Sequence, residues 1–142
     1  MDRPDDRDLL AHALVPVAHA EDARKTARAL EVYDPAHVTA LHVVEKGEGV
    51  PDKTPVEYSH ELAEESHAAV RETFPEAGEH IAYARDVVGA TLEAADEVDA
   101  SAIVYRSRGG GRIVQFLSGD LSVKLVIRAG RPVVALPTDS GE

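Results

Sequence analysis

The chain has 142 residues, a formal net charge of −11 and a hydrophobic content of 44%. This length suits one domain with its own core, and this apolar fraction excludes a disordered chain. So acidic a surface repels nucleic-acid phosphates and anionic lipids, and the lack of cysteine excludes disulfides, thiolate metal sites and a cysteine nucleophile.

The chain begins with a charged segment, MDRPDDRD, which lacks the apolar stretch of a secretory signal. No apolar run approaches the roughly 18 residues of a membrane span. We therefore predict a cytoplasmic protein with neither nucleic acid nor membrane as a partner. One domain over residues 1–142 is expected, with residues 1–7 and 138–142 frayed.

The first half of the chain alternates between strand and helix patterns. Residues 9–17 form a mostly apolar run, which predicts a buried strand. Residues 22–32 carry apolar side chains at helical spacing, and Asp22 favours a helix start. The valine-rich residues 37–44 predict a second strand, and the glycines, prolines and charges of residues 45–56 predict a long loop.

The second half repeats this alternation. The predicted helices cover residues 57–73, 89–98 and 119–129, and the predicted strands cover residues 79–85, 101–105 and 132–136. Regular alternation of this kind indicates a parallel sheet with helices on both faces. Pro132 and Pro137 bracket the last strand, which suits an edge position.

The most informative segment is VYRSRGGGRIVQFLSGDLSVKLV, residues 104–126, which leaves a strand and enters a helix. Its glycines allow close backbone approach to an anion, and the helix N-terminus offers free N–H donors. Arg106, Arg108 and Arg112 add forked donors. The segment is therefore either an anion cradle or a surface loop with glycines for turning and arginines for solubility.

The same segment resembles the signature of universal stress proteins, which is Gly, two residues, Gly, nine residues, then Gly-Ser or Gly-Thr. Here the frame falls on Arg106, Gly109, Gly119 and Asp120, and the spacing is kept. Other parts of the chain are also similar to the family, in order: VPVAHA at 15–20, LHVV at 41–44, residues 87–98 more loosely, and PVVALP at 132–137.

The resemblance implies a three-layer α/β fold, similar to adenine-nucleotide alpha-hydrolase-like and Rossmann-like proteins. Five parallel strands would form an open sheet of order 3-2-1-4-5 with helices on both faces. The strand order then reverses between the first and fourth strands, where loops 17–21 and 105–119 meet. The family also implies a homodimer, commonly through the fifth strand, although an edge strand equally suits a protected monomer.

The resemblance implies that this chain inherits a nucleotide-binding crevice, with ATP or ADP as the possible ligand. We expect no catalytic residue and no metal-binding residue. The predicted crevice residues are Pro16, Val17, Ala18, His19, Val43, Tyr105, Arg106, Arg108, Gly109, Gly119, Asp120 and Leu121.

Three of these positions depart from the family pattern. Ala18 stands where nucleotide-binding members have an aspartate, Arg106 replaces the first glycine, and Asp120 replaces the final hydroxyl. A carboxylate in the first turn of a helix competes with phosphate for the same N–H donors. We therefore hypothesise that Asp120 occupies the anion site itself, paired with Arg106 or Arg108.

These departures favour a non-catalytic regulatory or stress-response module with a degenerate crevice. The alternative is an ATP- or ADP-binding switch, with slow hydrolysis not excluded, in which Arg106, Arg108 and the glycine-rich loop hold phosphate. A third possibility, a small enzyme, lacks an evident acid–base pair or nucleophile.

The histidines give weaker signals. His60 and His67 share one face of the helix over 57–73 with Glu64, but helical zinc sites use an i, i+4 histidine pair, so we expect a solvated face. His12 and His42 lie in apparent strands, where packing is the simpler role.

Overall fold

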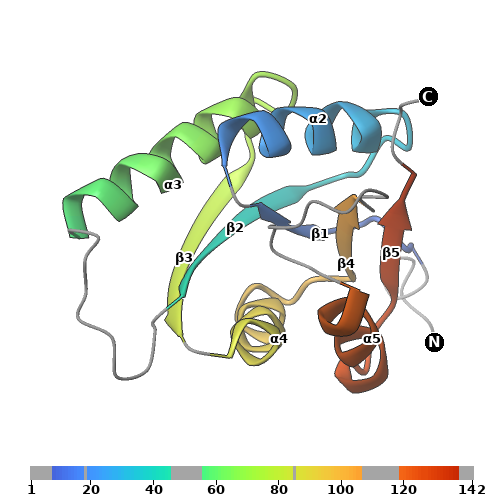
Figure 1. Cartoon of the computed structure of the whole chain (residues 1–142). Coiled ribbons are helices and arrows are strands. Elements are labelled where there is room, and N and C mark those ends of the chain that lie inside the picture. Colours follow the sequence, from blue (N-terminus) through green and yellow to red (C-terminus); the bar gives the residue numbers. More distant parts are fainter. Residues whose placement is uncertain (1–7, 18, 46–55, 85, 107–118, 138–142) are drawn as a thin grey trace.

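The computed structural model describes residues 8–17, 19–45, 56–84, 86–106 and 119–137 (Figure 1). Its strands are β1 (Ala13–Val17), β2 (Val38–Glu45), β3 (Gly78–Ala84), β4 (Ala102–Arg106) and β5 (Val133–Leu136). Its helices are α2 (Ala20–Glu31), α3 (Val56–Arg71), α4 (Val87–Val98) and α5 (Gly119–Arg128).

The strands form one five-stranded sheet in the order β3-β2-β1-β4-β5, and each neighbouring pair is parallel. In the central strand β1, Leu14 is level with Thr39 of β2 on one side and with Ile103 of β4 on the other. Every residue of β1 is buried, as expected for a parallel strand covered on both faces. The predicted fold class and the strand order that the family resemblance implies are confirmed.

Helices α2 and α3 cover one face of the sheet, and α4 and α5 cover the other (Figure 1). Successive side chains of a strand point to opposite faces, so each strand contributes to two cores. In β2, Ala40 packs in the cluster with Leu30 of α2 and Val70 of α3, whereas Leu41 packs with Val88 of α4 and Leu125 of α5. In the described part of the chain, no helix combines the length and the apolar character needed to cross a membrane.

Most elements differ from the sequence prediction by a few residues at one end or both, and two of these differences have clear local reasons. The strand expected from residue 9 begins at Ala13, because residues 8–11 form a turn in which the Ala11 N–H donates to the Asp8 carbonyl at 3.1 Å. Helix α4 begins before residue 89, because the Asp86 side chain caps it by accepting from the Gly89 N–H at 3.1 Å.

Candidate functional site

The candidate site lies where the strand order reverses, at the carboxyl ends of β1 and β4. These two strands are parallel neighbours, so both end at the same edge of the sheet. The chain leaves β1 for α2 on one face, whereas the helix that follows β4 lies on the other face (Figure 1). Proteins of this fold class bind ligands outside the carboxyl ends of the strands at such a switch point, and Val17 and Arg106 end the two strands there.

The Arg106 guanidinium is the central charged group at this place. Its Nη2 lies 3.3 Å from Oδ1 of Asp22, which is in the first turn of α2. The two side chains are 9% and 10% exposed, so the ion pair is largely withdrawn from water. Within the described part of the chain, the buried Nε of Arg106 has no hydrogen-bond partner. The guanidinium therefore keeps one buried donor that no described residue satisfies.

Helix α2 brings its own acceptors to the crevice. His19 is its N-cap residue, and the His19 Nδ1 accepts from the Asp22 N–H at 3.4 Å, which is a long and weak bond. Glu21 and Asp22 add negative charge to the first turn, where the helix dipole favours it. The role that the structure gives His19 is that of a helix cap.

The other predicted crevice residues fall into three groups. Pro16 and Val17 are buried in β1, Val43 of β2 packs against the core cluster below α4, and Tyr105 of β4 is partly buried. Ala18, Arg108 and Gly109 lie outside the described residues. Gly119, Asp120 and Leu121 open helix α5 with their backbone, while the contact predicted for the Asp120 carboxylate lies outside what the structure describes and stays a prediction.

Asp22 is the site residue that sequence reasoning missed. The sequence indicates Asp22 as a helix-start residue, and it predicts Asp120 as the partner of Arg106 or Arg108. The available signal was position: an acid in the first turn after β1 faces the same switch point as a residue that ends β4. Its contact with Arg106 bridges 84 positions of sequence, which no local pattern reports.

The histidines on α3 have two different environments. His60 is exposed, and its Nε2 lies 2.7 Å from the Tyr83 hydroxyl. The expectation of a solvated face is wrong for His67, because its side chain is 2% exposed and its Nδ1 lies 2.7 Å from Oε1 of Glu79. Among the residues that the structure describes, no three His, Asp or Glu side chains are grouped to hold a metal ion.

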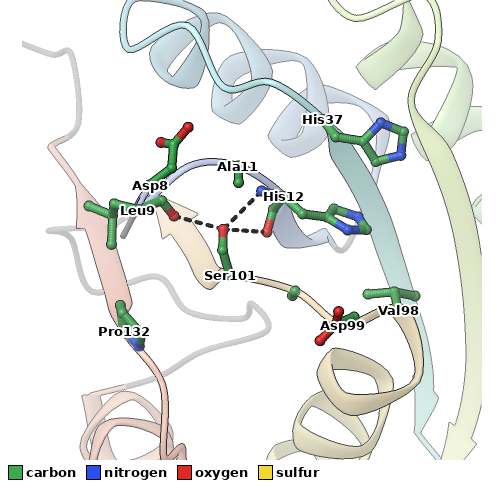
Figure 2. A pocket seen from close by; sticks show the side chains of 10 residues that line it. Asp8, Leu9, Ala11, His12, His37, Val98, Asp99, Ser101 and Pro132 are labelled. Carbon is green, nitrogen blue, oxygen red and sulfur yellow. Dashed lines mark hydrogen bonds between the residues drawn. The ribbon is translucent and has the colours of Figure 1, made fainter. Parts of the chain in front are cut away.

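A second hollow, of about 500 Å³, lies at the opposite edge of the sheet, beside the amino ends of β1 and β4 (Figure 2). The Ser101 hydroxyl closes part of its wall, accepting from the His12 N–H at 2.8 Å and lying 2.8 Å from the Leu9 carbonyl oxygen. The His12 Nε2 lies 2.7 Å from the Thr39 hydroxyl, and burial, followed by the nearby His37, lowers the pKa of His12. These polar groups, which line the hollow, are therefore engaged in hydrogen bonds that stabilise the fold.

The fold and the crevice define a doubly wound α/β protein, a class that binds ligands beyond the carboxyl ends of its strands. The model of the universal stress protein family matches residues 10–137, and the chain belongs to this family. A comparison with curated protein sequences finds no match.

Solved structures of the family share the fold at low sequence identity. A universal stress protein from Archaeoglobus fulgidus in complex with dAMP has a TM-score of 0.64 and 22% identity, covering 91% of this chain and 99% of that one. UspA from Lactobacillus plantarum has a TM-score of 0.61 and 22% identity, covering 89% and 97%. An Arabidopsis thaliana family protein with AMP bound has a TM-score of 0.59 and 14% identity, covering 92% and 93%.

Proposed function

We propose that this chain is a non-catalytic regulatory module of the universal stress protein family whose crevice resists polyphosphate nucleotides. The observation that carries the proposal is the buried ion pair between Arg106 and Asp22. The Asp22 carboxylate pairs with the Arg106 guanidinium, to which a phosphate group would otherwise bind. Asp22 thus occupies the anion site with an internal carboxylate, the role that the sequence predicts for Asp120. The absence of cysteine suits the cytoplasmic location expected for such a module.

The electrostatics of the pair oppose a nucleotide phosphate. Two unit negative charges about 4 Å apart repel by about 4 kcal/mol at an effective dielectric near 20. A phosphate that approached Arg106 would meet the Asp22 carboxylate at this cost, or would have to displace it from a largely buried cation. Glu21 adds a further negative charge to the same helical turn.

The test is isothermal titration of the protein with ATP in the presence of Mg²⁺. We expect the wild-type protein to bind weakly, in the high micromolar range or above. Asp22→Asn removes the competing charge and frees the Arg106 donors, so the affinity should rise about tenfold to hundredfold. Asp120→Ser combined with Ala18→Asp, which restores the family pattern, should also gain affinity.

The matched control is Glu21→Gln, because it removes the same charge from the same turn without touching Arg106. We expect it to change the affinity less than threefold. Low-micromolar binding by the wild-type protein would refute the proposal, and so would equal gains from Asp22→Asn and Glu21→Gln.

A second candidate function is an ATP- or ADP-binding switch in which Arg106 and Arg108 hold phosphate. One observation favours it: the Arg106 Nε is a buried donor without a partner in the described part of the chain, so the guanidinium retains hydrogen-bonding capacity. Family structures with dAMP, cAMP and AMP bound show relatives that hold adenine nucleotides. Low-micromolar ATP binding in the titration above would support this candidate.

We further propose that two copies of the chain associate through β5 and α5. Among the described strands, β5 lies at the edge of the sheet and pairs only with β4. The helix beside it, α5, carries an apolar surface that we call the α5 stripe, made of Val123, Val126 and Ile127 at i, i+3 and i+4, which are 57%, 56% and 74% exposed. A second copy covers both features at once, and the family resemblance favours this mode.

A further inference from the structure

A group of polar side chains is buried between α3 and the sheet, at a place that the crevice does not include. Ser66 and His67 of α3 are 0% and 2% exposed, and His42 of β2 is 6% exposed. In the described part of the chain, the Ser66 Oγ, the His67 Nε2 and the His42 Nδ1 have no hydrogen-bond partner. Buried polar atoms are normally bonded, so these three need an explanation, and two of them belong to rings close enough to interact electrostatically, His42 and His67.

The hydrogen bond made by Nδ1 of His67 decides whether the other ring nitrogen, Nε2, carries a proton. The His67 Nδ1 lies 2.7 Å from Oε1 of Glu79 on β3 and donates its proton there, because the carboxylate can only accept. Oε2 of the same carboxylate accepts from Nη2 of Arg71 at 3.1 Å, and the Arg71 Nε donates to the Ala77 carbonyl at 3.1 Å. Arg71 therefore already balances the charge of Glu79, and the neutral form of His67 completes the network.

Burial favours the neutral form of both rings. Burial lowers the pKa of His42, and the nearby His67 lowers it further. Burial also lowers the pKa of His67; Glu79 opposes this shift, and Arg71 adds to it. Helix α2 also packs against α3. Its charged residues Arg24 and Arg28 interact with the exposed Glu72, and they are not among the causes that shift the pKa of either ring.

We propose that His42 and His67 form an acid-sensitive latch, which holds α3 on the sheet while both rings are neutral and loosens it when either ring takes up a proton. A proton on His42 places an uncompensated charge against the underside of α3, because this ring has no acid partner among the described residues. A proton on His67 adds a second positive charge to a carboxylate that Arg71 already binds.

The latch adjoins the crevice. His42 directly precedes Val43, one of the predicted crevice residues, in the strand that borders β1. Val43 points to the α4 face, but His42 is level with Val17, the last residue of β1, so loosening of α3 at low pH would remove support beside this end of β1. This inference rests on the packing of α3, and it stands whether or not the crevice binds a nucleotide.

The sign of the pH dependence follows from the direction of the shifts. The pKa values of the two rings lie below the ordinary value of 6.5 in the folded protein, so the folded state binds fewer protons than the open state. The contribution of the two rings to the packing of α3 is therefore fully present above pH 6.5. It decreases as the pH drops below 6.5, until the folded pKa values are reached. Each ring lowers the closing equilibrium constant of α3 by up to about tenfold per pH unit in this window.

The test is amide hydrogen exchange, measured as protection factors corrected for intrinsic rates, at about pH 7 and about pH 5. We expect the α3 amides to lose protection at least tenfold more than the α4 amides in the wild-type protein. In His42→Leu, an apolar side chain of similar size replaces one ring, and this selective loss should shrink at least threefold. His67→Gln, which keeps a donor for Glu79, should shrink it as well and serves if His42→Leu folds poorly.

His60→Gln is the matched control, because His60 is an exposed histidine on the same helix. It should lose α3 protection as the wild-type protein does. The latch is overturned if α3 and α4 lose protection equally in the wild-type protein, or if His60→Gln reduces the selective loss as much as His42→Leu and His67→Gln do.

Discussion

At the scale of single residues, two arginines bind the protein's own oxygen atoms in different ways. Arg106 faces one carboxylate across the crevice. Arg131 instead serves the ends of two elements, because its Nη1 donates to the carbonyls of Ala95 and Ala100 at 3.1 and 2.6 Å. Its Nη2 pairs with Asp96, so one side chain joins the end of α4 to the residues before β5.

Removal of the Arg131 side chain should therefore lower the stability of the whole domain. Arg131→Ala leaves two carbonyls without their charged donor, and we expect the free energy of unfolding to fall by about 2 kcal/mol. Urea unfolding measures this change. Arg131→Lys keeps the charge but lacks the planar fork, so an intermediate loss is expected. A loss for Arg131→Ala below about 0.5 kcal/mol, as for an ordinary surface site, would contradict this account.

At the scale of elements, α4 is capped by a specific residue at each end. Asp86 caps its N-terminus, and Asp99 ends it in the left-handed conformation with φ of 58°. Gly89 has little room for a side chain, because an added Cβ would lie 2.7 Å from Oδ2 of Asp86. The glycine therefore leaves space for the carboxylate that caps the helix.

The cap makes a testable contribution to stability. Asp86→Ala leaves the Gly89 N–H without its acceptor, and we expect the free energy of unfolding to fall by about 1 kcal/mol. Asp86→Asn keeps an acceptor at the same place and should lose less than half of that amount. Thermal and urea unfolding of the two variants measure the difference. Equal losses in both would assign the effect to charge, including the 3.7 Å pair with Arg128, instead of to the cap.

The elements and their order were predictable because they depend on local patterns. The apolar runs, the helical spacing and the family-like segments place each strand and helix within a few residues. The burial of His67 was not predictable, because it depends on which part of α3 the sheet covers. Among the α3 side chains that the structure describes, from residue 60 onward, the first buried one is Ala63, so His60 is exposed although it shares its helical face with His67. The pair of Asp22 with Arg106 was hidden for the related reason that it forms between distant segments.

At the scale of the whole molecule, the acidic surface and the apolar α5 stripe have opposite effects on association. A net charge of −11 makes two copies repel each other, and this repulsion weakens as salt screens it. The α5 stripe and the edge position of β5 among the described strands favour contact between copies. We therefore expect a dimer whose dissociation constant falls as the salt concentration rises.

A lysine in the α5 stripe should break this dimer. Ile127→Lys places a charge where a second copy would bury an apolar side chain, and we expect the dissociation constant to rise at least tenfold. Sedimentation velocity over a range of protein concentrations measures it. Val32→Lys is the control, because Val32 is 78% exposed at the end of α2, on the opposite face of the sheet from α5 (Figure 1). A wild-type protein that sediments as a monomer at every concentration, or equal effects of both lysines, would argue against the interface.

The position of β1 at the centre of the sheet also has a consequence during synthesis. One side of β1 pairs with β2, which follows it closely in the chain, but the other side pairs with β4, which begins at Ala102. A ribosome must therefore make most of the polypeptide before this apolar strand gains its second neighbour. Until then the nascent chain carries an open hydrophobic edge, a natural place for a chaperone to bind.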